Sequence, residues 1–329
     1  MKVLGITAGR KGGNSEIMLK TALEECERLG AEVIMVNLYD YKIHHCLGCS
    51  MCGGNETAQD ALSASAKGNC LWSGKDGDEM EKIMEEYLDA DGVILSIPTY
   101  DLMPSGLYTT FANRTITYEA GFLRMKGVNL KDRVAGLISV GGSSRTWQSM
   151  ALEGLQATVF TQSIQVVDQY LCTGVTLKGH VIIREDHLAK AKEVAQHVIE
   201  AIQTPVEERK WLGDPDMGWC PVCHSNALVK GEKHWDGIYW PIECQVCGAG
   251  GNLEKQADGG FKFVIAEDGM LKCRIFEKSR DKHFEEVMHF HSQTQVPENK
   301  EKIKEKWDKE KRTREKSVEN PAWAYSSAG

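Results

Sequence analysis

The sequence predicts an α/β fold: a doubly wound, five-stranded parallel sheet followed by a small, metal-stapled β module. Apolar runs and amphipathic stretches alternate as far as residue 202, which is typical of successive β-α units. The alternation stops near residues 204–205, and beyond it four cysteines occur as two Cys-x₂-Cys pairs. Such pairs indicate a metal site that holds a short β segment together.

Five apolar runs have the length and β-branched content of strands buried on both faces. They cover residues 3–7, 32–37, 92–97, 133–140 and 164–171. Amphipathic stretches between and after them predict helices over residues 15–29, 78–89, 105–120, 144–160 and 185–202. Because β-α-β crossovers are right-handed, we expect these helices to cover both faces of the sheet.

Composition changes along the chain predict three parts. The sheet domain covers residues 1–205 and contains a cysteine-bearing loop over residues 44–77. Residues 206–297 form the Cys₄ metal-ribbon module, which is rich in Gly, Trp and short strand-like pieces. Residues 298–329 begin with a charge-dense stretch and are expected to form a charged helical tail.

Composition and charge limit the possible functions. The 329 residues are 42% hydrophobic and 26% charged, with a net charge of −8, which argues against binding to nucleic acid. No apolar run is long enough to span a bilayer, and no signal peptide is evident. We therefore expect a cytoplasmic protein that binds neither nucleic acid nor membranes. In a reducing compartment, its clustered cysteines indicate metal ligands before disulfides.

The first strand ends in a glycine-rich turn that leads directly into a helix. Such a turn presents backbone N–H groups and a helix N-terminus to an anion, and Asn14 or Ser15 can cap the helix. The strand–loop–helix context favours a phosphate site over a plain tight turn. The candidate residues are Thr7, Gly9, Arg10, Gly12, Gly13, Asn14 and Ser15.

This turn resembles the Gly-Ser-Pro-Arg-Lys-x-Gly-Asn-Thr motif of the NADPH-dependent FMN reductase family. The chain departs from that motif at residues 7–9 and matches it at Arg10, Lys11, Gly13 and Asn14, and conservatively at Ser15. The resemblance implies a flavodoxin-like fold and an FMN cofactor whose phosphate lies in this turn.

Two later segments resemble the same family. Pro98, Thr99 and Tyr100 match its Ser-Pro-x-Tyr segment, which continues through Gly106 and Phe111 to Arg114, and residues 139–142 match its Gly-rich loop. The resemblance implies that Pro98, Thr99, Tyr100, Gly141 and Gly142 frame the flavin ring. Independently of the family, all three segments follow parallel strands, so they share the edge where open α/β sheets bind ligands.

A first cysteine group follows the second strand and therefore lies at the same edge. It has the spacing Cys46-x₂-Cys49-x₂-Cys52, with Cys70 following after 17 residues. Three close thiolates and a distant fourth suit a [4Fe–4S] cluster, and loop closure costs little more for a long loop than for a short one. The group also resembles the cysteine motif of iron–sulfur flavoproteins, a branch of the same family. Unmetallated or redox-disulfide cysteines, and zinc, remain the alternatives.

A second cysteine group consists of Cys220, Cys223, Cys244 and Cys247, with 20 residues between the two pairs. Each Cys-x₂-Cys turn directs two sulfurs at one ion. We expect Zn²⁺ here, with rubredoxin-type iron as the alternative, since both use tetrahedral thiolate ligands.

Together these features predict a flavin-dependent oxidoreductase that transfers electrons between FMN and a [4Fe–4S] cluster to a small-molecule or protein acceptor. We expect NAD(P)H or a ferredoxin as the electron donor, although no motif in the sequence identifies it. No residue need act as a covalent catalyst, because the cofactors carry the chemistry. The resemblance implies a homodimer or homotetramer. Two alternatives are an NAD(P)H-dependent FMN or quinone reductase without a cluster, and a redox- or metal-sensing interaction protein.

Overall fold

The computed structural model describes residues 1–49, 70–118, 130–162, 164–275 and 277–313. The chain consists of two compact units, one ending at Asp281 and the other starting at Lys282. The three-part division expected from the sequence remains a prediction. Within the described ranges, no helix combines the length and apolar character needed to cross a membrane.

The sheet expected from the sequence is present, with five parallel strands in the order β2-β1-β3-β5-β6. Its strands are β1 (Lys2–Thr7), β2 (Glu32–Asn37), β3 (Gly92–Tyr100), β5 (Arg133–Val140) and β6 (Ile164–Cys172). The order reverses between β1 and β3, where chain crossovers leave opposite faces and ligands of such sheets bind. This confirms the doubly wound α/β architecture.

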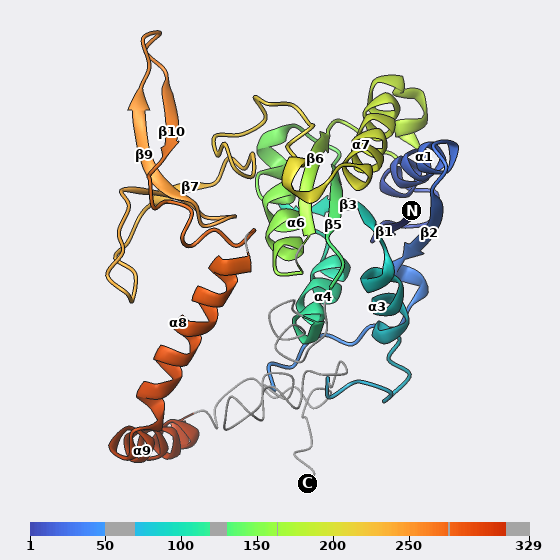
Figure 1. Cartoon of the computed structure of the whole chain (residues 1–329). Helices are drawn as coiled ribbons and strands as arrows, with labels where there is room; N and C mark the ends of the chain where they lie inside the picture. The colour runs from blue at the N-terminus through green and yellow to red at the C-terminus, as the bar shows by residue number, and fades with distance from the viewer. Residues whose placement is uncertain (50–69, 119–129, 163, 276, 314–329) are drawn as a thin grey trace. The chain divides into compact units, whose positions relative to one another are not determined.

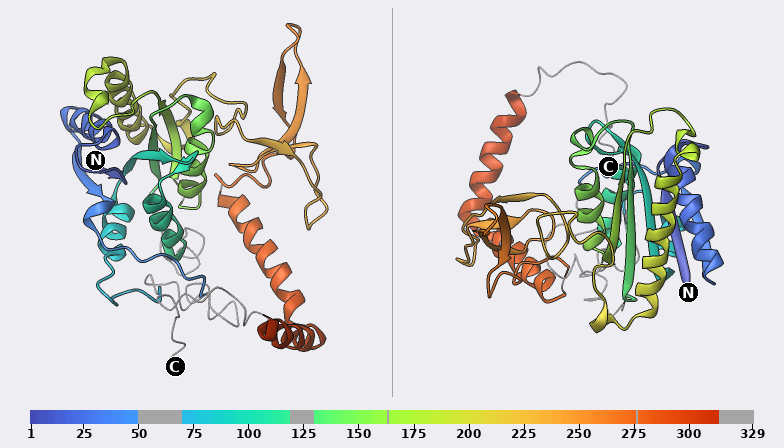
Figure 2. Two further views of the ribbon diagram at one scale, coloured as in Figure 1. Left: turned by 180° about the vertical axis from the view of Figure 1, so that it is seen from behind. Right: turned by 90° about the horizontal axis from the view of Figure 1, so that it is seen from above.

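Helices cover both faces of the sheet (Figures 1 and 2). They are α1 (Asn14–Arg28), α3 (Met80–Asp89), α4 (Gly106–Arg114), α6 (Ala151–Phe160) and α7 (Glu185–Gln203). Short 3₁₀ turns are η1 (Leu38–Asp40), η2 (Thr115–Tyr118), η3 (Arg145–Gln148), η4 (His180–Ile183) and η5 (Val206–Glu208). The apolar faces of α1 and α7 share one buried cluster, while those of α3, α4 and α6 share another. Burial on both sides explains why the strands are almost continuously apolar.

The third strand is longer than its apolar run suggests. It extends to Tyr100 because a short strand, β4 (Met103–Pro104), folds back and pairs with it in antiparallel fashion. The two residues of the turn, Asp101 and Leu102, have φ values of 50° and 72°. Two positive φ values are the requirement of a type I′ hairpin turn, which usually takes Asn and Gly. The turn is therefore strained, and it lies at the ligand edge.

Two predicted helices are interrupted. The helix expected over residues 144–160 divides into η3 and α6, because the Met150 N–H donates to Leu102 O of the hairpin and not within its own helix. The helix expected over residues 105–120 is α-helical only to Arg114 and continues as η2. The hydroxyls of Thr115 and Thr117 donate to backbone carbonyls three residues back, which competes with regular helical bonding.

The cysteine-rich module forms a separate antiparallel sheet in the order β10-β9-β8-β7. Its strands are β7 (Leu228–Lys230), β8 (Ile242–Cys244), β9 (Gly250–Lys255) and β10 (Phe261–Ile265). The side chains of the second cysteine group belong to the same buried cluster as α4 and α6. Two helices follow, α8 (Glu277–Gln295) and α9 (Pro297–Thr313).

Candidate functional site

The glycine-rich turn after β1 is held by neighbouring strands. The Gly9 N–H donates to Thr7 Oγ1 (3.2 Å), and the Asn37 side chain of β2 donates to Gly9 O (3.0 Å). The next glycine, Gly12, has a φ of 68°, a conformation that favours glycine. These contacts fix the turn at the carboxyl edge before any ligand binds.

The N-terminus of α1 suits an anion. Its cap residue is Gly13, and no side chain caps the helix, so the anion-binding character of the first turn is left available. The expected capping by Asn14 is wrong, because its amide donates to Val175 O and Leu177 O and its Oδ1 accepts from Val181 N. Asn14 instead ties the turn to the loop after β6. The Gly12 N–H is engaged within the turn by Glu16 Oε2 (2.8 Å).

Lys178 also lies beside this turn, although it belongs to no motif in the sequence. It belongs to the loop after β6, and a Cβ placed on Gly12 would lie 2.9 Å from its Cε and 3.3 Å from its Nζ. An exposed ammonium group over an uncapped helix N-terminus adds positive charge where a phosphate would bind. The only signal was the position of Lys178, after a strand that ends at the same edge.

The second and third loops are joined by hydrogen bonds. Thr99 Oγ1 lies 2.8 Å from Ser139 Oγ and 3.3 Å from Gln148 Oε1, while Gln148 Nε2 donates to Ser143 O (3.1 Å). A Cβ on Gly141 would lie 2.3 Å from Gln148 Cδ, so any larger residue there would displace the Gln148 side chain. Next to them, Tyr100 is half exposed at the hairpin. The edge thus offers an anion-binding turn at one end and fixed polar groups beside an exposed aromatic ring at the other.

The first cysteine group lies at the same edge. Cys46, Cys49 and Cys70 line one cavity of about 160 Å³, together with Trp72 and Arg114. Cys46 and Cys49 are exposed, and Cys70 is half-buried. The fourth candidate ligand, Cys52, lies outside the described residues. The structure therefore brings Cys70 to Cys46 and Cys49 across the long connection.

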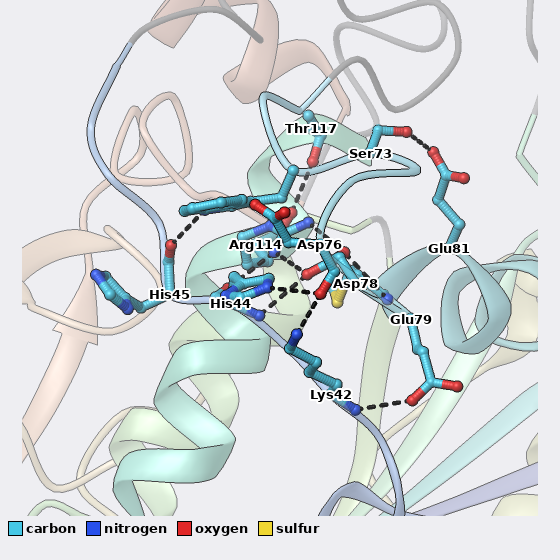
Figure 3. A network of polar contacts seen from close by, with 12 residues as sticks. Lys42, His44, His45, Ser73, Asp76, Asp78, Glu79, Glu81, Arg114 and Thr117 are labelled. Atoms are coloured by element: carbon cyan, nitrogen blue, oxygen red, sulfur yellow. Dashed lines mark hydrogen bonds and ion pairs between the residues drawn. The ribbon is translucent and has the colours of Figure 1, made fainter. Parts of the chain in front are cut away.

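A network of polar contacts joins the segment before Cys46 to the segment before α3 (Figure 3). Arg114 donates to both carboxylate oxygens of Asp78 at 2.8 and 2.9 Å, and also to His44 O. The His44 N–H donates to Asp78 Oδ2 (3.0 Å), and the Lys42 and Glu79 backbones are joined by a further bond. These contacts hold residues 42–46 against residues 76–79.

The charge pair in this network is almost completely buried, with side-chain exposures of 3% for Arg114 and 1% for Asp78. Burial raises the pKa of the Asp78 carboxyl. Hydrogen bonds from Arg114 and the His44 N–H outweigh that effect and leave the pKa below its usual value. Asp78 is therefore ionised at neutral pH, as its bidentate contact with Arg114 requires.

Trp72 lines the cysteine cavity and packs against the histidines that precede Cys46. Trp72 stacks on His44 with ring centroids 4.3 Å apart, and its indole N–H donates to His45 O (3.0 Å). These contacts give His44 a packing role.

The second cysteine group has the geometry of a tetrahedral metal site. All four sulfurs lie within 4.8 Å of one another and all four residues are buried. The Cys220–Cys247 and Cys223–Cys244 sulfurs are 3.7 and 3.5 Å apart. These separations are far longer than a disulfide bond and close to the ~3.8 Å edge of a tetrahedron with metal–sulfur bonds of about 2.3 Å.

Each Cys-x₂-Cys pair of this group forms a knuckle, the first over residues 220–223 and the second over residues 244–247. Both knuckles have the same backbone turn. The N–H of the residue after each second cysteine, His224 or Gly248, donates to the first cysteine's carbonyl at 2.8 Å. Both residues have positive φ, 55° and 82°. His224 is not a glycine, but its ring stacks on Trp211 with centroids 4.1 Å apart. That contact helps a non-glycine residue hold the strained turn.

Comparison with known proteins agrees with this geometry. Residues 1–174 match the model of the NADPH-dependent FMN reductase family. An iron–sulfur flavoprotein of Archaeoglobus fulgidus is 24% identical over 212 residues, covering 62% of this chain and 96% of that protein. A protein named flavone synthase cfoJ, from Aspergillus candidus, is 24% identical over 305 residues, covering 87% of this chain and 88% of that protein.

One solved structure resembles nearly the whole chain. It is described as a flavone reductase, has a TM-score of 0.72 at 20% sequence identity, and covers 97% of this chain and 100% of its own. At that identity the likeness shows a shared fold, which includes the cysteine-rich module. The family match covers more than half of the chain and all three loops of the ligand edge. The chain therefore belongs to the NADPH-dependent FMN reductase family and is an FMN-dependent oxidoreductase.

Proposed function

We propose that the chain is an NAD(P)H-dependent FMN oxidoreductase whose first cysteine group holds a [4Fe–4S] cluster and which reduces a small-molecule acceptor. One observation carries the cluster: Cys70 lines the same cavity as Cys46 and Cys49, across residues 50–69. Cys52 supplies the fourth thiolate in this proposal. The relative named iron–sulfur flavoprotein supports the same assignment.

In the proposal, the glycine-rich turn and α1 hold the FMN phosphate, and Lys178 adds positive charge beside them. The fixed polar groups of the second and third loops orient the ring. The proposed FMN residues are Thr7, Gly9, Arg10, Gly12, Gly13, Asn14, Ser15, Pro98, Thr99, Tyr100, Gly141 and Gly142. Bound FMN supplies both two-electron and one-electron chemistry, which lets a hydride donor and a one-electron cluster work in one enzyme.

The second cysteine group is proposed to hold Zn²⁺. A closed site of four buried thiolates is typical of structural zinc, and rubredoxin-type iron is the alternative. The distances between its sulfurs suit either ion, so metal analysis of the purified protein is needed to distinguish zinc from iron.

Counting iron and acid-labile sulfide after anaerobic purification tests the cluster. We expect about four of each per chain in the wild type, and Cys70→Ala should remove most of the sulfide while FMN content is unchanged. Cys26→Ala is the control, since Cys26 is buried in α1 away from the cavity and its loss should leave the sulfide in place. Sulfide-free wild-type protein, or Cys70→Ala protein with full sulfide, contradicts the proposal.

Lys178→Gln should weaken FMN binding about fivefold, the scale expected for an exposed charge contact of up to ~1 kcal/mol. The effect should shrink at high salt and disappear for riboflavin, which lacks the phosphate. Fluorescence titration of the apoprotein measures both affinities. Lys190→Gln is the matched control, because Lys190 is paired with Glu193 on the surface of α7. Equal FMN affinity in the two variants refutes the role of Lys178.

A second candidate is a reductase of the same kind without a cluster. It is favoured by the two relatives that span nearly the whole chain, named flavone synthase and flavone reductase. Rapid reduction of bound FMN by NADPH in sulfide-free protein identifies this case.

A further inference from the structure

A second cavity, of about 300 Å³, lies beside the ligand edge and is lined by η3, the start of α6, β6 and the segment around the first cysteine knuckle. We propose that this cavity is the substrate pocket and that it takes a small hydroxylated aromatic compound. The inference rests on the proposed reductase function and adds to it the place and chemical class of the acceptor.

The cavity borders the flavin loops through one side chain. Gln148 lines it, and the same side chain contacts Gly141 and lies 3.3 Å from Thr99 Oγ1. Gln148 is buried, so it forms a wall shared by the ring-binding loops and the cavity. A molecule in the cavity therefore lies next to the place proposed for the flavin ring.

One buried acceptor in the cavity wall lacks a partner. Gln169 of β6 lines the cavity and is only 2% exposed. Its Nε2 donates to His224 O (2.9 Å), whereas Oε1 has no hydrogen-bond partner among the described residues. A buried amide oxygen without a donor costs about 1–3 kcal/mol. A ligand hydroxyl at this point would satisfy it.

The other residues that line the cavity indicate a ligand with an aromatic ring system. Leu152, Leu171 and Met217 line the cavity with apolar groups, which suit a flat, carbon-rich molecule. Arg145 lines it as an exposed side chain, without an ion pair or hydrogen bond to any residue that the structure describes. Its guanidinium can donate to a carbonyl or phenolate oxygen.

The volume favours a small acceptor. About 300 Å³ lies at the lower end of the range for ligand pockets, enough for a molecule of two or three fused or linked rings. A whole nicotinamide dinucleotide does not fit, so the cavity is assigned to the acceptor and not to the electron donor.

The metal module supplies part of the wall. Met217 and Asn226 flank the first knuckle, and the Asn226 N–H donates to Glu153 Oε1 at 3.3 Å. Gln156 of α6 donates to Cys223 O. The first knuckle is thus bonded directly to α6, which gives the module a role in shaping the pocket.

Binding of two probes to the FMN-loaded enzyme tests the pocket. The probes are 7-hydroxychromone and chromone, which differ by one hydroxyl, and their dissociation constants are measured from the change in flavin absorbance. The wild type should prefer 7-hydroxychromone at least ~10-fold, since the hydroxyl pairs a buried acceptor. Gln169→Leu should reduce that preference to about one. Met217→Trp should weaken both probes at least ~10-fold by filling the cavity.

Leu253→Trp, on an exposed position of β9, is the matched control and should bind both probes as the wild type does. NADPH-driven ferricyanide reduction reports the flavin function separately, because ferricyanide needs no pocket. If that activity and the bound FMN are absent, the proposed function fails. If both are present, the pocket assignment alone is overturned by any of three results: wild type binding neither probe at millimolar concentration, equal affinity for the two, or Met217→Trp binding like Leu253→Trp.

Discussion

Asp78→Asn should lower the free energy of unfolding by about 3–5 kcal/mol, because it leaves the Arg114 guanidinium buried without its counter-charge. The side chains of this pair are at most 3% exposed, so water cannot replace the lost carboxylate. The melting temperature of the flavin-binding part should fall by on the order of 10 °C. Thermal unfolding followed by circular dichroism measures the change.

The same variant should also loosen the cysteine segment, since Asp78 accepts the His44 N–H just before Cys46. Iron content should therefore fall together with stability. Lys131→Ala is the control, because it breaks ion pairs with Asp89 and Asp91 whose side chains are all partly exposed, and each such pair contributes about 0–1 kcal/mol. The interpretation fails if Asp78→Asn costs no more than this control.

The pH dependence of stability shows whether Asp78→Asn acts by removing a charge or by disturbing the packing. The pKa of Asp78 is lower in the folded protein than its ordinary value, so its contribution is complete above the unfolded pKa of about 3.9. It disappears as the pH falls through the lower pKa of the folded state. The stability difference between wild type and Asp78→Asn should therefore narrow in acid below about pH 4. A difference that stays constant across this range indicates packing alone.

The arrangement of the sheet could be predicted from the sequence because it depends on local patterns. Apolar strand runs alternate with amphipathic helices, and the handedness of crossovers then determines which loops meet at the carboxyl edge. The two Cys-x₂-Cys pairs similarly predicted convergence of Cys220, Cys223, Cys244 and Cys247, since each short turn places two sulfurs together.

The parts that could not be predicted depend on contacts between residues far apart in the sequence. Asn14 binds carbonyls at residues 175 and 177, and Lys178 reaches Gly12. The break between η3 and α6 arises because Leu102 accepts a hydrogen bond from Met150. Leu102 lies in a hairpin turn with positive φ values, and the turn contains no glycine that would indicate them in the sequence. Propensity and periodicity describe neighbours along the chain, so they carry no information on these pairs.

Removal of the metal from the second cysteine group should unfold the module that it holds. The module has strands of only three to six residues, and a structural zinc site of this kind contributes about 10–16 kcal/mol of binding free energy. We expect amide hydrogen exchange over residues 217–275 to be faster in the Cys244→Ser protein than in the wild type.

Cys273 provides the matched control for that substitution. It is buried in the same cluster as those four cysteines, but it is outside the group of four whose sulfurs all lie within 4.8 Å. Cys273→Ser should keep one metal ion per chain and most of the protection. Equal metal loss in the two variants indicates that Cys273 is a ligand and that the tetrahedral assignment is wrong.

Loss of the metal should also destabilise the flavin-binding part, because the first knuckle is hydrogen-bonded to it. Gln156 and Gln169 donate to the carbonyls of Cys223 and His224. If the knuckle unfolds, each buried amide loses its acceptor, at a cost of about 1–3 kcal/mol unless water enters. Exchange should therefore rise in α6 and β6 as well as in the module, while α1, on the opposite face of the sheet, keeps its protection. Unchanged exchange in α6 and β6 in the Cys244→Ser protein would show that the two parts are energetically independent and that the metal site stabilises the module alone.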